Sequence, residues 1–111
     1  MENIIHLFQI TVATSVAYVW IFRFHNVLKE FELFQLSDLI RNFVGVSKIS
    51  LATLIIVSIW YPSLTLIPSL LMGGFMLSAQ FFHFKVNNPF IKHLPSLLLL
   101  ILCSVIAYSS F

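Results

Sequence analysis

Long apolar runs constrain this chain more than any other feature of its sequence. The chain has 111 residues, and continuously apolar stretches occupy residues 4–22, 43–60, 64–84 and 96–111. Crossing a hydrocarbon core takes about 20 helical residues, and only helices and closed barrels satisfy their own backbone hydrogen bonds inside lipid. Because these runs do not alternate between apolar and polar residues, barrel strands are excluded. We therefore expect an all-α membrane four-helix bundle that forms a single transmembrane domain.

Charged residues are too scarce to cover a water-soluble surface. Only 9% of the residues are charged and 59% are hydrophobic, with a net charge of +2, whereas about 25% of a soluble domain is charged. This balance excludes a soluble domain, a disordered tail and a nucleic-acid-binding protein. Cys103 is the only cysteine, so the chain forms no internal disulfide. The lipid bilayer is the expected partner of most of the surface.

The segment between the first and second spans has a different pattern. Residues 26–42 concentrate charges, yet apolar residues recur there at roughly helical spacing. This pattern predicts an amphipathic segment at the membrane interface. Within it, Ser37 followed by Asp38 is a typical helix start, because the hydroxyl caps backbone amides and the carboxylate favours the positive end of the helix dipole.

The basic residues indicate which side of the membrane each connection faces. All six lie in or beside the first and third connections: Arg23, Lys29, Arg41, Lys48, Lys85 and Lys92. The positive-inside rule places such connections in the cytoplasm, so we expect both termini on the non-cytoplasmic side. The third connection is predicted to be a loop over residues 86–95, because Asn87, Asn88, Pro89 and Pro95 are turn-forming residues.

Three polar side chains are candidates for a ligand site or polar cleft: Lys48, Gln80 and His83. Lys48 lies about one turn inside the second span, where it either extends to the head groups or pairs with a carboxylate of the preceding segment, Glu30, Glu32 or Asp38. His83, at the end of the third span, either satisfies a neighbouring carbonyl, relays a proton or binds a head group with Lys85.

The glycines and hydroxyls of the spans favour a structural interpretation. Gly45, Gly73 and Gly74 are candidate helix-packing positions, because small residues let helices approach closely. We expect the hydroxyls to bond mainly within the helices or between them. No catalytic residue is predicted, because no catalytic triad, phosphate loop or dinucleotide pattern occurs. No metal site is predicted either, because the four histidines lack ligand spacing.

Short motifs occur in a characteristic order along the chain. The first span ends in basic residues, VGVSKI (44–49) begins the second, QFFH (80–83) ends the third, and KVNNP (85–89) and LPS (94–96) follow. Over residues 10–108 this order resembles the DoxX-like family of small four-helix membrane proteins. Many members carry an acidic residue where this chain has Lys48, and the reversed charge argues against transferring a proton-handling role to this position.

The resemblance implies an architecture more than an activity. The family takes its name from a membrane subunit associated with thiosulfate:quinone oxidoreductase, and relatives are linked to redox-stress complexes and to receptor-channel assembly. Two functions follow as expectations. The first is a non-enzymatic interaction or accessory subunit that holds a membrane protein partner or a second copy of itself. The second is a redox-linked accessory that binds a quinone or lipid-like molecule in an intramembrane cleft. Apart from such a ligand no cofactor is expected, and the expected location is the bacterial inner membrane.

Overall fold

Helices account for nearly the whole chain in a computed structural model that describes residues 2–110. They are α1 (Glu2–Phe22), α2 (Phe24–Leu33), α3 (Asp38–Val57), α4 (Leu66–Lys85) and α5 (Phe90–Ser109), with a short 3-10 helix, η1 (Pro62–Leu64), before α4. No strand occurs within residues 2–110. The all-α helical bundle that the apolar runs predict is therefore confirmed.

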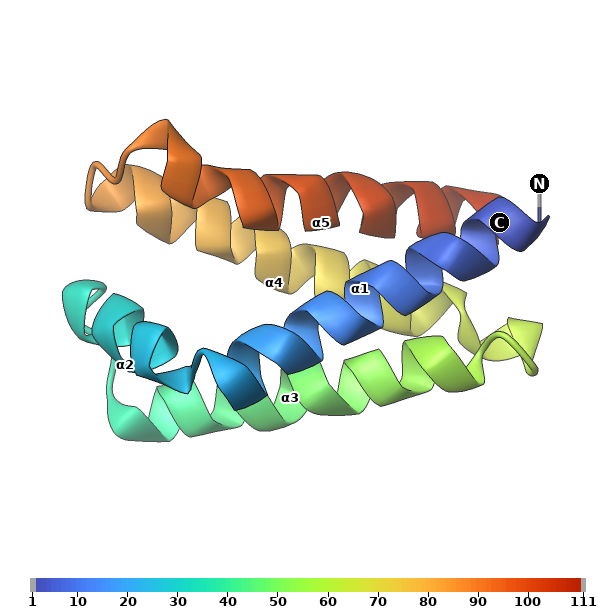
Figure 1. Cartoon of the computed structure of the whole chain (residues 1–111), viewed down its shortest axis with the longest axis horizontal. Helices are drawn as coiled ribbons and strands as arrows, with labels where there is room; N and C mark the ends of the chain where they lie inside the picture. The colour runs from blue at the N-terminus through green and yellow to red at the C-terminus, as the bar shows by residue number, and fades with distance from the viewer. Residues whose placement is uncertain (1, 111) are drawn as a thin grey trace.

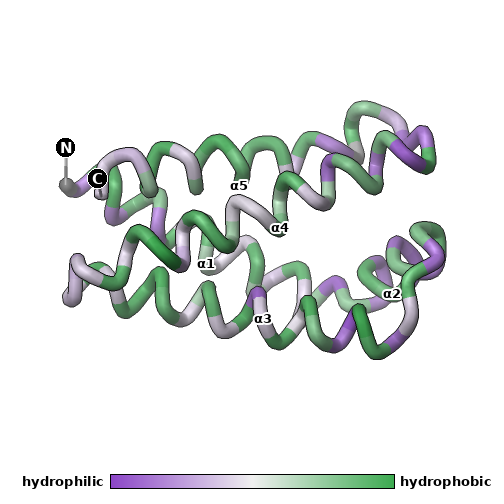
Figure 2. The backbone as a smooth tube through the Cα atoms, turned by 180° about the vertical axis from the view of Figure 1, so that it is seen from behind, coloured by the Kyte–Doolittle hydropathy of each residue, from purple (hydrophilic) through white to green (hydrophobic). Residues whose placement is uncertain are grey.

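Successive long helices, α1, α3, α4 and α5, run in opposite directions along the bundle (Figure 1). Helices α4 and α5 form a closely paired hairpin, and α1 crosses the bundle from α5 near the termini to α3 near α2. The ends of the chain and the α3–α4 turn lie at one end of the bundle, whereas α2 and the α4–α5 turn lie at the other. Hydrophilic residues gather at the α2 end (Figure 2). The first and third connections, which carry the basic residues, thus share one end.

A narrow core lies between the helices, and the apolar surface around it faces outward. Val12, Ile55, Met72 and Ile106 are fully buried at the centre. Many large apolar side chains on the outer faces are exposed, among them Leu7, Phe22, Phe43, Ile67, Leu77 and Phe81. An outer surface of this kind is stable in hydrocarbon and not in water.

Helix length and composition agree with membrane crossing. Three helical segments, residues 3–22, 38–57 and 62–85, are long and apolar enough to span a bilayer. The apolar part of α5, His93–Ser109, is shorter. Trp60 and Tyr61 are exposed at the α3–α4 turn, where aromatic side chains typically lie at the membrane–water interface.

The connection between α1 and α3 differs from its prediction in extent. The amphipathic helix is α2, which ends at Leu33, and residues 38–42 belong to α3 instead. The predicted cap at Ser37 is the reason, because its Oγ accepts a hydrogen bond from the Ile40 amide at 3.3 Å and starts α3 there. Gln35, with a φ of 61°, turns the chain between the two helices.

The loop predicted over residues 86–95 is too long. It covers only residues 86–89, because α5 begins at Phe90 and Pro95 lies inside that helix. Asn87, with a φ of 56°, reverses the chain within this short turn. Pro95 lies in the second turn of α5, and side chains of Gln80 and Ser96 bond to the nearby carbonyl of His93.

Candidate functional site

A cleft lies at the α2 end of the bundle, and all five helices line it. Its volume is about 760 Å³, within the range of about 300–1,000 Å³ that is common for small-molecule sites. The polar lining residues are Ser15, Arg23, Asn26, Lys29, Glu30, Lys48, His83 and Ser96. The apolar lining residues are Val16, Val19, Trp20, Val27, Met76, Ala79, Ile91, Pro95 and Leu99.

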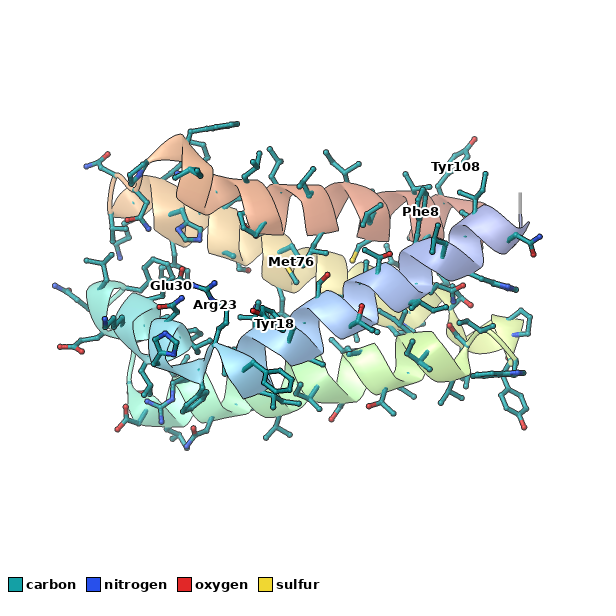
Figure 3. The ribbon with its side chains drawn as sticks, in the orientation of Figure 1. Phe8, Tyr18, Arg23, Glu30, Met76 and Tyr108 are labelled. Carbon is teal, nitrogen blue, oxygen red and sulfur yellow. The ribbon has the colours of Figure 1, made fainter. Side chains whose placement is uncertain are left out.

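The charged lining residues gather toward one end of the cleft. Val16 precedes Arg23 by seven residues, and Met76 precedes His83 by the same number, which corresponds to about 10 Å along a helix. Val16 and Met76 belong to the buried core. Arg23 and Glu30 point into the space between α2 and the α4–α5 hairpin, with Met76 nearer the middle of the bundle (Figure 3). The cleft therefore has a charged mouth and an apolar floor.

The charged groups at the mouth come from the α1–α2 link, from α2 and from α3. Lys48 projects from α3, and its ammonium lies 5.8 Å from the centre of the Trp20 ring. Lys48 also interacts electrostatically with Glu30 of α2. Asp38, another carboxylate considered for this lysine, instead pairs with Arg41 at 2.8 Å. Glu30 is thus the α2 carboxylate whose charge acts on Lys48.

Aromatic contacts hold α2 over the cleft. Trp20 of α1 packs edge-on against Phe31 of α2 with ring centres 5.9 Å apart. Phe34, at the end of α2, stacks on Phe82 of α4 at 5.3 Å and meets His83 edge-on at the same separation. Because Phe34 is buried, these rings join α2 to both sides of the bundle.

A hydrogen-bond network closes the α4–α5 hairpin beside the cleft. Nε2 of Gln80 donates to the His93 carbonyl at 2.8 Å and to Oγ of Ser96 at 2.6 Å. Its Oε1 lies 3.1 Å from Nδ1 of His93, whose Nε2 lies 3.1 Å from the carbonyl oxygen of Asn88. The side chains of Gln80 and His93 are therefore engaged within the hairpin.

The side chain of Asn88 determines which nitrogen of His83 carries hydrogen. Nδ2 of Asn88 lies 2.7 Å from Nδ1 of His83. An amide nitrogen only donates, so Nδ1 of His83 accepts and the hydrogen of the neutral ring resides on Nε2. His83 is buried and lines the cleft. The ring therefore brings an N–H donor to this site.

The candidate residues predicted from the sequence fall in different places. Lys48 and His83 line the cleft, whereas Gln80 lies outside its lining and serves the hairpin. Gly45 is packed against Trp20, since an added Cβ would meet its ring at 2.7 Å. Gly73 is in ordinary contact range of Cys103, and Gly74 faces open space.

Sequence reasoning missed several residues that the fold brings together. Arg23 and Lys29 were assigned to topology or to the amphipathic segment, and Glu30 was considered only as a partner of Lys48, yet all three line the cleft. Gln9 was also missed. It is buried in α1 and donates to Oγ of Ser58 on α3 at 2.7 Å. A glutamine within an apolar span is itself the signal that such a bond exists.

Most hydroxyls of the spans follow the expected local pattern. Thr11, Thr14, Thr53 and Ser78 each donate to a backbone carbonyl four residues earlier in the same helix. Among the residues whose side chains the structure describes, no group of three or more His, Cys, Asp or Glu is placed to hold a metal ion.

The apolar exterior, the helix lengths and the cleft with one charged end define an integral membrane protein of the helical-bundle class. The model of the DoxX-like family matches residues 4–106. The chain belongs to this family, as the order of its motifs indicates. Comparisons with curated proteins and with solved structures gave no match.

Proposed function

We propose that this protein is a non-enzymatic accessory protein of the membrane that binds a lipid-like molecule in the cleft. The observation that carries the proposal is the joining of a charged mouth to an apolar floor within one volume of about 760 Å³. An amphiphile, whether a lipid or a quinone, matches this division, because its head would meet Lys48 and His83 and its chain would lie along Val16, Met76 and Leu99.

Binding is favoured over catalysis by the state of the polar groups near the cleft. Gln80 and Ser96 bond to each other and to the His93 carbonyl, so their hydrogen-bonding capacity serves the fold. Cys103, the chain's only thiol, is buried against the core and does not line the cleft. The remaining groups suit recognition of a head group.

Native mass spectrometry of protein purified in an uncharged detergent tests the proposal. We expect a retained lipid or quinone in the native protein. Ala79→Leu, which adds bulk inside the cleft, should remove it. Ser78→Leu is the matched control, because it adds bulk to the exposed neighbouring position of α4. Equal ligand retention in both variants, or no retained ligand in the native protein, would overturn the proposal.

A second candidate function, docking of a partner helix, rests on a different hollow. Between α1 and α3 lies an apolar hollow of about 330 Å³, lined by Ala13, Thr14, Ala17, Ile21, Ile49, Ala52, Thr53, Ile56 and Val57. Small residues four apart, such as Ala13 and Ala17, are typical of close helix packing in membranes. If a second copy or a partner docks there, Ala17→Leu should reduce the oligomeric fraction in native mass spectra, whereas Gly74→Leu on α4 should not.

We also propose that the α2 end faces the cytoplasm of a bacterial inner membrane, with both termini on the opposite side. The clustering of the basic residues at the end that contains the first and third connections supports this orientation.

A further inference from the structure

The lining of the cleft has a strong imbalance of charge. Three basic side chains, Arg23, Lys29 and Lys48, face it together with one carboxylate, Glu30. These groups come from the α1–α2 link, from α2 and from α3, so the fold gathers them from separate segments. Because Glu30 offsets one positive charge at most, the mouth of the cleft is cationic.

His83, at the mouth of the cleft, adds an N–H hydrogen-bond donor. Asn88 occupies Nδ1 of His83 as a donor, which leaves the ring hydrogen on Nε2. The polar groups that line the mouth are thus rich in N–H donors, and this chemistry fits a group made of several acceptor oxygens.

We infer that the cleft selects amphiphiles whose head group is an anionic oxyacid, a phosphate or a carboxylate, over neutral quinones and zwitterionic lipids. This inference rests on the proposed function, since it names the class of molecule that the cleft takes. The head group lies among Arg23, Lys29, Lys48 and His83, and the hydrocarbon chain extends along Val16 and Met76. Phosphates and carboxylates are the groups that arginine and lysine recognise best.

Quenching of Trp20 fluorescence tests the selectivity directly, because Trp20 lines the cleft. Trp60 lies at the opposite end of the bundle and is 70% exposed, so the experiment uses the full chain with Trp60→Phe to isolate the Trp20 signal. In an uncharged detergent, the probes are brominated phosphatidylglycerol, brominated fatty acid, brominated phosphatidylcholine and decylubiquinone. We expect the two anionic probes to quench at concentrations at least about tenfold lower than the other two.

Substitutions separate the cleft from general attraction to the charged end. Lys29→Gln should weaken binding of the anionic probes about fivefold. Lys85→Gln is the matched control, because Lys85 is also exposed at this end but does not line the cleft, and it should leave binding unchanged. His83→Phe keeps a ring and removes the donor, and it should weaken binding of the anionic probes selectively.

The outcomes distinguish this inference from the proposed function. Equal quenching by all four probes, without an effect of Lys29→Gln, would overturn the anionic selectivity and leave amphiphile binding intact. Quenching by none of them would overturn both. Inorganic phosphate separates a lipid head group from a free anion. If millimolar phosphate competed as strongly as the lipid, the lipid's hydrocarbon chain would contribute nothing to binding. That result would overturn an amphiphile site.

Discussion

The side-chain amide of Asn88 donates to Nδ1 of His83 across the α4–α5 turn at 2.7 Å. This bond joins a turn residue to a residue of the cleft. The turn can be short because Asn87 reverses the chain through its positive φ and brings Asn88 back toward α4. The geometry of the hairpin thereby sets the hydrogen-bonding character of the site.

The tautomer of His83 is the first measurable consequence. We expect nitrogen-15 NMR of the neutral ring to show hydrogen on Nε2, because Asn88 occupies Nδ1 as a donor. Asn88→Ala removes that donor, and the ring should then populate both tautomers. His25, which is exposed, is the internal control and should not respond. Hydrogen on Nδ1 in the native protein would contradict the assignment.

The bond between Gln9 and Ser58 should couple α1 to α3 energetically. Gln9→Leu and Ser58→Ala should each lower the free energy of unfolding, and a double-mutant cycle should give a coupling of about 0.6 kcal/mol, the usual value for an interhelical hydrogen bond in a membrane. Thr11→Val is the control, because Thr11 bonds within its own helix. It should change stability by less than about 0.5 kcal/mol. Strictly additive effects of the two single changes would argue against the bond.

The glycines should differ in their tolerance of alanine. A Cβ at residue 45 would lie 2.7 Å from the Trp20 ring, so Gly45→Ala should displace that ring and lower stability. Gly74 faces open space, so Gly74→Ala should raise stability by about 0.5–1 kcal/mol through helix propensity. Reversible unfolding in detergent measures both. A stabilising Gly45→Ala would contradict the close packing of Trp20.

Lys48, on α3, should stabilise the contacts of that helix with Trp20 of α1 and Glu30 of α2. Its interaction with Trp20 is of the kind worth about 1 kcal/mol, and Glu30 adds attraction. Because about 1 kcal/mol shifts the Tm of a domain of about 100 residues by about 4–8 °C, Lys48→Ala should lower Tm by several degrees. Lys85→Ala, which removes an exposed lysine from 6.0 Å above Phe82, is the control and should have a smaller effect. An unchanged Tm for Lys48→Ala would exclude the stabilising role.

The orientation in the membrane can be read with single cysteines. In a Cys103→Ala background, Ser63→Cys lies in η1 and Asn87→Cys lies in the α4–α5 turn, both at exposed positions at opposite ends. An impermeant maleimide should label residue 63 in intact cells and residue 87 only after permeabilisation. The opposite pattern would reverse the proposed topology.

Local signals in the sequence predicted much of the fold. The apolar runs indicated membrane helices, the basic residues identified one end of the bundle, and Ser37 marked the true start of α3. Each of these depends on neighbours along the chain. The same local reasoning made the last loop too long, because Pro95 was taken as a turn residue although it lies in the second turn of α5.

The candidate site was only partly predictable, for a physical reason. Lys48 and His83 stood out because polar groups in apolar spans are costly, and both line the cleft. The contributions of Arg23 and Glu30 depend on how the α1–α2 link turns over the bundle, and those of Gln9 and His93 depend on which partner another helix presents. By itself the sequence determined that the protein lies in lipid, which segments are helical and which end of the bundle is charged. These properties follow from composition and short-range order. The cleft and the hydrogen-bond partners were decided by tertiary structure, because only packing brings residues that are distant in the chain within contact range.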